Sequence, residues 1–275
     1  MTSTRPGYGQ VDRDYAIRLA TTDPADDGPI WMVNLMRYKP VATYAEGEAE
    51  GAAVSGREAD DRYAPLDVLA DIGAEVVFFG DVEDQLLGEG EPWERLGIVR
   101  YPTGRSFIAM QQRNDFKERH VHKEAGMERT IVMGCHPAGG DLAAPTDTTG
   151  LPDWADVPHP PTDDDGPVVV IHVTRYVEGG GRDEMRQYTS AAAKTAVPQG
   201  VRIAGWFDVD GTIVGDGREW HQVRLNRFPS KAAFMAVVHD PARLEAQSAH
   251  REPALADTYT LVVRPTIDTL PFSSG

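Results

Sequence analysis

The segment WERLGIVRYPTGRSF at residues 93–107 decides the fold, because its counterpart, WHQVRLNRFPSKAAF, occupies residues 220–234. Identical positions at one offset of 127 residues, without a gap, include Gly73/Gly200, Trp93/Trp220, Arg100/Arg227, Pro102/Pro229 and Phe107/Phe234. A repeat of this length is too long for a solenoid unit and close to a small domain. The sequence therefore predicts duplication and fusion of a one-domain ancestor, in a chain that supplies both halves of any ancestral homodimer.

Weaker matches extend the repeat on both sides. His122-Lys123-Glu124 matches His250-Arg251-Glu252 at an offset of 128, and Arg37-Tyr38 matches Arg175-Tyr176 at an offset of 138. The first copy thus carries about 11 extra residues between its first strand and its first shared glycine.

Composition indicates an ordinary globular chain of 275 residues, 41% of them hydrophobic, with a formal charge of −16. Such a charge repels phosphate backbones and anionic lipid, so we expect no nucleic acid and no membrane among its partners. No run of 18 apolar residues and no apolar segment at the N-terminus occur, which predicts a cytoplasmic protein. The single cysteine, Cys135, cannot form an internal disulfide and is expected to be inert.

Apolar patterning predicts the element order β-α-β-β-α-β twice. The expected strands are 30–38, 75–80, 95–101 and 131–133, then 168–176, 202–208, 220–227 and 258–264. The expected helices are 11–22, 42–70 and 104–114, a helix or turn over 116–130, then 182–195 and 230–239. This order is the ferredoxin-like split βαβ. The predicted fold is α+β, with two tandem ferredoxin-like domains (βαββαβ) that form an intramolecular pseudo-dimeric α+β barrel.

The predicted domains are 11–137 and 167–270, joined by a linker over 138–166 that is rich in Pro, Asp and Gly. That composition, without an apolar period, is typical of an extended tether, and Trp154 is expected to attach it to the surface. We expect a monomer with an internal pseudo-dimer and leave a further homodimer open.

Several motifs resemble one family of the dimeric α+β barrel superfamily, a small uncharacterised one-domain family with a VNL-x-RYK first strand. They are MVNLMRYK at 32–39, Phe79-Gly80 at the end of the second strand, and Arg100-Tyr101-Pro102 before a helix that bears Phe107. The second copy keeps the skeleton but replaces Asn34 with His172 and Phe79-Gly80 with Trp206-Phe207. The resemblance implies the fold. The superfamily includes cofactor-independent monooxygenases of aromatic polyketides, cyclases, lactone isomerases and haem-binding enzymes, so function must be argued from the site.

Asn34 and His172 occupy equivalent positions in otherwise apolar stripes of the two first strands. A polar side chain there needs a hydrogen-bond partner, so each is either a structural tie or a substrate contact. An imidazole can transfer a proton near neutral pH and an amide cannot, which makes His172 the candidate base.

The third strands supply further candidates. Trp93 and Trp220 are either core anchors or stacking surfaces for a planar substrate. His221 shares one alternating face with Arg227, giving a second candidate base beside a cation, if that face lines the cleft; otherwise His221 lies at a solvated strand edge. Trp206, from the second strand of copy two, is expected to form a pocket wall.

Arginines and tyrosines recur at matching positions. Arg175 and Arg227, with their counterparts Arg37 and Arg100, either form salt bridges between the copies or stabilise a developing anion. Tyr176 and Tyr188, like Tyr38 and Tyr63, either pack or offer phenols to a substrate.

Two other chemistries lack support in the sequence. His120 and Glu124 share a helical face, but two ligands do not make a site, so no metal is expected. Gly179-Gly180-Gly181 lacks the register of a dinucleotide motif, and no nucleophile elbow occurs.

The sequence thus predicts a cofactor-independent tailoring enzyme that acts on a small aromatic or polyketide-like molecule by proton abstraction, as a cyclase, isomerase or monooxygenase. The expected catalytic residues are His172, His221, Arg175 and Arg227, and the expected substrate-binding residues are Trp206, Trp220, Tyr176, Tyr188, Asn34 and Trp93. The alternatives are a non-catalytic protein of the same fold that binds a small ligand or has a structural role, and haem-linked chemistry.

Overall fold

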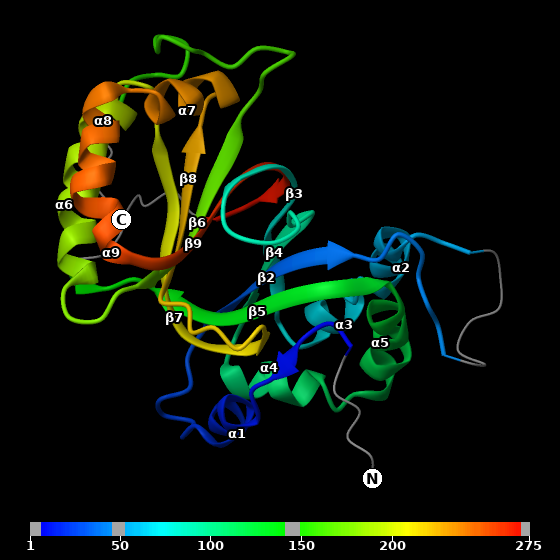
Figure 1. The fold of residues 1–275 in the computed structure, drawn as a ribbon. Coiled ribbons are helices and arrows are strands. Elements are labelled where there is room, and N and C mark those ends of the chain that lie inside the picture. The colour runs from blue at the N-terminus through cyan, green and yellow to red at the C-terminus, as the bar shows by residue number, and fades with distance from the viewer. Residues whose placement is uncertain (1–6, 46–52, 141–148, 271–275) are drawn as a thin grey trace. The chain divides into compact units, whose positions relative to one another are not determined.

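The structure, a computed structural model, describes residues 7–45, 53–140 and 149–270. Its described residues form two compact units (Figure 1). Unit 1 comprises Met1–Phe79, Pro92–His136 and Asp210–Glu219, and unit 2 comprises Gly80–Glu91, Pro137–Val209 and Trp220–Gly275. Each unit therefore contains a short segment from the other half of the chain. The domain boundaries expected from the sequence stay a prediction.

Unit 1 is built on an antiparallel sheet. Its central strand β2 (Ile30–Tyr38) lies between β4 (Arg95–Tyr101) and β5 (Met127–Pro137). The first part of β3 (Glu75–Leu87) follows β4, and beyond β5 come the end of β7 (Arg202–Gly215) and β1 (Gln10–Val11). The apolar residues of β2 and β4 produce this sheet because most positions in both strands are buried and none is exposed.

Helices cover the sheet of unit 1 and complete its core. They are α1 (Arg13–Thr21), α2 (Gly56–Tyr63), α3 (Leu66–Asp71), α4 (Gly104–Met110) and α5 (Asn114–Gly126). Val68 and Leu69 from α3 and Phe116 from α5 pack into one apolar cluster with Ile30 and Met32 of β2. Capping boxes at Ser55 and Thr103 fix the starts of α2 and α4.

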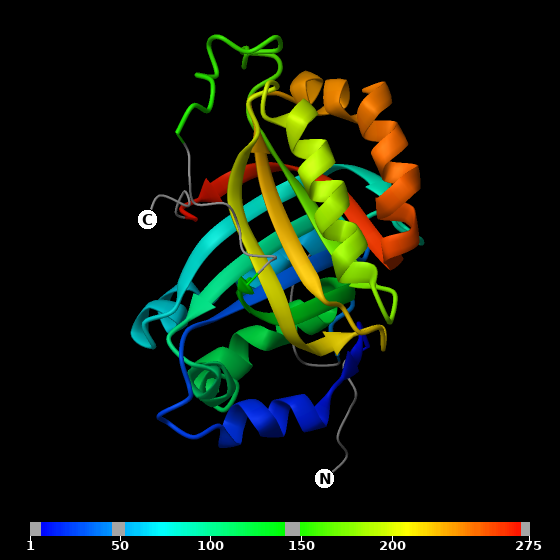
Figure 2. The same ribbon diagram turned by 90° about the vertical axis from the view of Figure 1, so that its left-hand side faces the viewer.

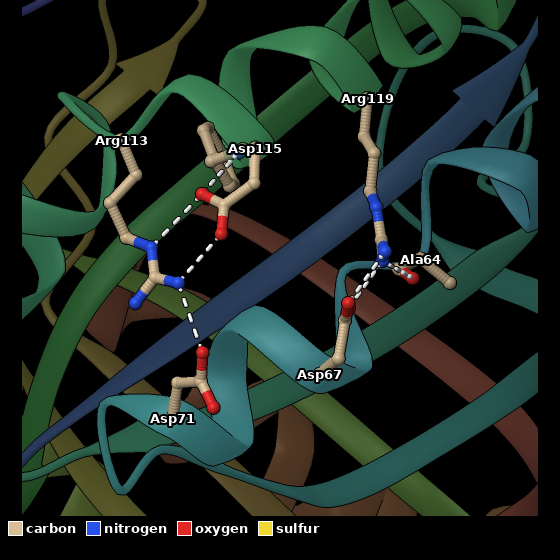
Figure 3. Close-up of polar contacts among 7 residues, drawn as sticks. Ala64, Asp67, Asp71, Arg113, Asp115 and Arg119 are labelled. Atoms are coloured by element: carbon tan, nitrogen blue, oxygen red, sulfur yellow. Dashed lines mark hydrogen bonds and ion pairs between the residues drawn. The ribbon is translucent and has the colours of Figure 1, made fainter.

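Ion pairs tie α3 to α5 on the surface of unit 1 (Figure 3). Arg113 lies 3.0 Å from Asp71 and 2.6 Å from Asp115, and Arg119 pairs with Asp67. Exposed pairs of this kind contribute little each, so the apolar cluster beneath them supplies most of the stability of this unit.

Unit 2 has its own antiparallel sheet with β6 (Val168–Tyr176) at its centre. β6 pairs with β8 (Gln222–Phe228) on one side and with β9 (Leu255–Asp268) on the other. The first part of β7 pairs with β8, and the second part of β3 follows β9. Glu83 of β3 bonds Arg264 of β9 at 2.8 Å, which fastens this arm within the unit.

Helices lie along one face of this sheet (Figures 1 and 2). They are α6 (Gly181–Ala196), α7 (Lys231–Val238), α8 (Pro241–Ala246), the π-helical segment η2 (Gln247–Arg251) and α9 (Glu252–Ala254). α6 packs against α8, η2 and α9. Phe234 and Val237 of α7 bury against Val168, Val170 and Phe228 of the sheet. Trp154 donates to the carbonyl oxygen of Gly200 at 2.7 Å, as expected for the residue that attaches the segment before β6.

Most predicted elements are present, with three corrections. β3, β5, β7 and β9 are longer than predicted, and the added parts of β3 and β7 are rich in polar, partly exposed residues that lack an apolar run. The helix expected over 42–70 is confined to α2 and α3, with 46–52 outside the described residues. The segment 116–130 divides into α5 and the start of β5, and α8, η2 and α9 were not predicted.

The fold is therefore mixed α+β with an antiparallel sheet in each unit. Within the described residues, no helix has the length and apolar character needed to cross a membrane.

Candidate functional site

A pocket of about 610 Å³ lies within unit 2, between the helices and the sheet. This volume falls in the range that holds small organic ligands. Twenty residues line it, most of them apolar: Leu151, His172, Met185, Tyr188, Thr189, Ala192, Ala193, Ala196, Val197, Val201, Arg202, Ile203, Trp206, Arg224, Asn226, Phe228, Phe234, Val237, Arg243 and Arg251.

The sequence of α6 explains why space remains here. The residues of this helix that line the pocket are Met185, Tyr188, Thr189, Ala192, Ala193 and Ala196, which recur with helical spacing on one face. The last two turns of that face carry only alanines, whose methyl groups cannot reach across to the sheet. A Leu or Phe stripe would close the gap, so the alanines leave room for a ligand.

Strand register places four side chains in one line across the sheet, three of which line the pocket: Trp206, Arg224 and His172. Trp206 lies opposite Arg224, Arg224 opposite His172, and His172 opposite Thr260, on β7, β8, β6 and β9 in turn. Directly opposite residues of antiparallel strands point to the same face. We call these four residues the pocket row.

His172 is the titratable base of the pocket row. Its Nδ1 lies 3.1 Å from Oγ1 of Thr260, and its Nε2 has no hydrogen-bond partner in the described part of the chain. Burial lowers the pKa of His172 well below its usual value, and the charges of Arg251, Arg224 and Arg243 lower it further. The imidazole is therefore neutral at physiological pH and keeps a nitrogen lone pair that can accept a proton.

Arg224 is buried under the pocket, with 3% of its surface exposed. Its Nε donates to Oε1 of Gln222 at 2.5 Å and its Nη1 to Oγ1 of Thr189 at 2.7 Å, while the guanidinium stacks 4.2 Å from the ring of Trp206. Nη2 is buried and has no acceptor among the described residues. Burial lowers the pKa of Arg224, which shows how poorly its charge is compensated.

Two more arginines complete the cationic side of the pocket. Arg251, at the end of η2, is also buried and donates only two long bonds of 3.4 Å, to Thr258 and Thr260. Arg243 donates from Nε to the hydroxyl of Tyr188 at 3.1 Å. Across residues 7–45, 53–140 and 149–270, no carboxylate lies within ion-pair distance of Arg224, Arg243 or Arg251. Three of the four arginines that line the pocket therefore have incomplete charge compensation. The fourth, Arg202, lies over the ring of Trp154.

The structure brings three of the predicted site residues together. His172, Trp206 and Tyr188 all line the pocket, and Nε1 of Trp206 donates to Oδ1 of Asn226 at 3.1 Å. This indole is thereby held flat beneath Arg224.

His221 and Arg227 do not converge on the pocket. The face of β8 that lines it carries Arg224, Asn226 and Phe228, and alternation places Arg227 on the opposite face. Nδ1 of His221 accepts the backbone N–H of Tyr176 at 2.8 Å, and Arg227 pairs with Asp268 at 2.5 Å. Both residues have structural contacts.

The remaining candidates lie away from the pocket. In unit 2, Arg175 is exposed, Trp220 packs on Tyr259, and the hydroxyl of Tyr176 donates to Gln222. In unit 1, Nδ2 of Asn34 donates to the carbonyl oxygen of Met32 at 2.9 Å, and Trp93 is buried beneath Arg129.

Sequence reasoning missed Arg224, Arg243 and Arg251. One signal was present, because Arg224 stands where the first copy has Gly97 and Arg251 where it has Lys123. A buried cation in place of a glycine is the largest change between the two copies along this strand. Arg243 gave no signal, since the helices after α7 were not predicted.

The described residues contain no group of three or more His, Cys, Asp or Glu side chains that could hold a metal ion. In unit 1, Nε2 of His120 lies 3.0 Å from the hydroxyl of Tyr8 and 3.8 Å from Glu124.

Comparisons with known proteins concern the fold. No family model matches the chain, and no curated protein matches it. A protein of unknown function from Rhodopseudomonas palustris is 27% identical, with a TM-score of 0.41, over 49% of this chain and 99% of that one. A monooxygenase-like protein from Lactobacillus acidophilus is 12% identical, with a TM-score of 0.42, over 90% and 97%.

A mutant chlorite dismutase from Candidatus Nitrospira defluvii is 10% identical, with a TM-score of 0.47, over 91% of this chain and 95% of that one. The first-strand family and the tandem pseudo-dimer stay predictions. The likenesses carry no argument about substrate or reaction.

Proposed function

We propose that unit 2 is a cofactor-independent enzyme that removes a proton from a small aromatic or polyketide-like molecule bound in its pocket. One observation carries the proposal. A neutral imidazole faces a mostly apolar pocket and lies near three of its four arginines, Arg224, Arg243 and Arg251, which pairs a base with the means to stabilise the anion that it creates.

His172 acts as the base through Nε2. In the tautomer that carries its hydrogen on Nδ1, that N–H donates to Oγ1 of Thr260, and the lone pair of Nε2 is free. Thr260 is then a positioning residue that fixes both the tautomer and the orientation of the ring. The lowered pKa of His172 keeps it in the basic form at neutral pH.

The arginines stabilise the product of proton transfer. When the substrate C–H or O–H bond breaks, its proton goes to Nε2 and its electron pair stays on the substrate as an enolate or phenolate. The positive charge of Arg224 and Arg251 stabilises this anion more than the neutral substrate, which lowers the barrier. Protonated His172 is repelled by the same cations, so it readily returns the proton.

The fate of the anion decides the subclass. Reprotonation at another carbon gives an isomerase, and attack on a carbonyl group of the same molecule gives a cyclase. Electron transfer to molecular oxygen followed by carbon–oxygen bond formation and protonation gives a hydroperoxide, and loss of water from it leaves a carbonyl group, the outcome of a monooxygenase. All three begin with the step assigned to His172.

Hydrogen–deuterium exchange tests that step without knowledge of the natural substrate. The probes are 2-tetralone, whose C1–H is acidified by its ring and carbonyl group, and a 2-tetralone carrying a ring carboxylate. Deuterium incorporation at C1 in D₂O is followed by NMR, with and without protein. We expect exchange above the buffer rate and a loss of roughly a hundredfold in His172→Gln. Asn34→Ala, at the matching position of unit 1, is the control and should retain full exchange.

The outcomes separate the two main hypotheses. Probe binding with no exchange above buffer contradicts the enzyme and supports a ligand-binding protein. Equal exchange in His172→Gln and in the unsubstituted protein places the base elsewhere and overturns the role of His172.

A further inference from the structure

The geometry points to the class of ligand that the pocket takes: we propose that it binds an aromatic carboxylate, with the carboxylate group on Arg224 and Arg251. This inference deepens the proposed function, on whose pocket it rests. It concerns binding alone, so it can hold or fail independently of proton transfer.

Uncompensated charge is the first step. Arg224 and Arg251 are 3% and 4% exposed, and neither has a carboxylate within ion-pair distance among the described residues. Removing a cation from water without an anionic partner is costly, so buried guanidinium groups are ordinarily paired. Asp208 and Glu252 act on these arginines only from beyond ion-pair range. A bound anion would supply the missing charge.

Unused hydrogen-bond capacity is the second step. Nη2 of Arg224 is buried without an acceptor, although Nε and Nη1 of the same group are satisfied. Arg251 makes only bonds of 3.4 Å. A planar carboxylate offers two oxygens to such donors, a geometry that guanidinium groups match well.

The walls of the pocket define the rest of the ligand. Trp206, Phe228 and Phe234 contribute aromatic surface, and α6 contributes its alanine face. Flat apolar walls favour a planar ring system, because the burial of its apolar surface is favourable and breaks no hydrogen bonds. Neutral His172 adds no charge of its own and can contact the ring or its substituents.

A pair of probes tests the inference directly. 2-Naphthoate and 2-naphthamide have the same ring and nearly the same shape but differ by one negative charge. Isothermal titration at pH 7.5 should show that the protein binds 2-naphthoate at least about tenfold more tightly than the amide. Arg224→Met and Arg251→Met should each bring the two affinities to within about twofold, and Arg224→Lys should restore part of the preference.

A control separates a local site from the general effect of charge. Lys194→Met removes one exposed cation from α6 outside the pocket and should leave the preference unchanged.

Each result has a consequence. Equal affinity for the two probes, or binding of neither, overturns the anion site, and neither result depends on the folding of a variant. A preference that survives both Arg→Met substitutions also overturns it. A clear preference for 2-naphthoate without any deuterium exchange in the tetralones keeps the anion site and rejects the proposed enzyme.

Discussion

Units 1 and 2 arrange their central strands in the same register but carry different side chains at the matching positions. In unit 1, Asn34 lies opposite Gly97 on one side and Val132 on the other. In unit 2, the same places are taken by the pocket-row residues His172, Arg224 and Thr260. The same backbone arrangement thus places two apolar residues, Gly97 and Val132, beside Asn34 in unit 1, and places Arg224 and Thr260 beside His172 in unit 2.

The difference in filling follows from these substitutions. At Gly97, an added Cβ would lie 3.2 Å from the ring of Phe79 and 3.5 Å from Met36, so aromatic and thioether groups occupy the space. In unit 2, Arg224 and Trp206 stack at the floor and the alanines of α6 leave the volume above them open. At this position unit 1 is therefore filled by side chains, whereas unit 2 has a pocket.

The largest expected effect comes from forcing the residue of one unit into the other. Gly97→Arg must displace Phe79, and such overpacking costs about 1–3 kcal/mol of unfolding free energy. Arg224→Met removes a poorly compensated buried cation and should leave stability equal or higher while it weakens anion binding. Urea unfolding of both variants checks this. A stable Gly97→Arg protein, or an Arg224→Met protein that is clearly less stable, would contradict the comparison.

The second largest effect is expected in the pH dependence of the unfolding free energy, to which His172 contributes. Its pKa in the folded protein is lowered, so below the unfolded value near 6.5 the unfolded chain binds more protons. This contribution is complete above pH 6.5 and is lost as pH falls, by up to about 2 kcal/mol at pH 5. His172→Gln should flatten the stability profile between pH 7 and 5. The same slope in that variant would show that His172 is not buried in its neutral form.

His120 gives unit 1 a separate acid response, since burial, with a smaller effect of Lys123, lowers its pKa to about 4. His120 is present in both the unsubstituted protein and the His172→Gln variant, so its contribution to the pH dependence of stability is the same in both. His136→Gln, which alters an exposed imidazole, is the matched control.

Filling the pocket should have a smaller effect. Ala192→Leu projects a branched side chain from α6 into the ligand volume and should weaken 2-naphthoate binding about tenfold, or about 1.4 kcal/mol. Ala191→Leu, at the adjacent helix position outside the pocket lining, should bind normally. Titration of both variants decides whether the alanine face accepts the ligand. Unchanged affinity in Ala192→Leu would place the ligand elsewhere.

Thr260→Val makes the pocket row resemble unit 1 at one position and should have the smallest effect. Loss of the contact to Nδ1 of His172 should slow deuterium exchange a few-fold, roughly threefold to tenfold, because the ring loses its fixed tautomer. Thr260→Ser should restore the rate and the pH profile. A rate unaffected by either substitution would remove the positioning role of Thr260.

The repeat and the central strands could be predicted from the sequence, because β2 and β6 are largely apolar runs and β4 contains the apolar core Leu96–Val99. His172 stood out as the polar exception in one of those runs. Which face of β8 lines the pocket could not be predicted from the sequence. Val223 and Leu225 on one face are buried, and so is Arg224 on the other, so the alternation of side chains does not distinguish the two faces. The position of Arg251 is set by the π-helical segment η2, which no periodic pattern in the sequence predicted.

A crystal structure of the protein with 2-naphthoate tests the central claim most directly. The account predicts one ligand in unit 2, with its carboxylate oxygens within hydrogen-bond distance of Arg224 and Arg251 and its ring against Trp206. A pocket left empty at saturating 2-naphthoate, or a carboxylate that points away from both arginines, would contradict it.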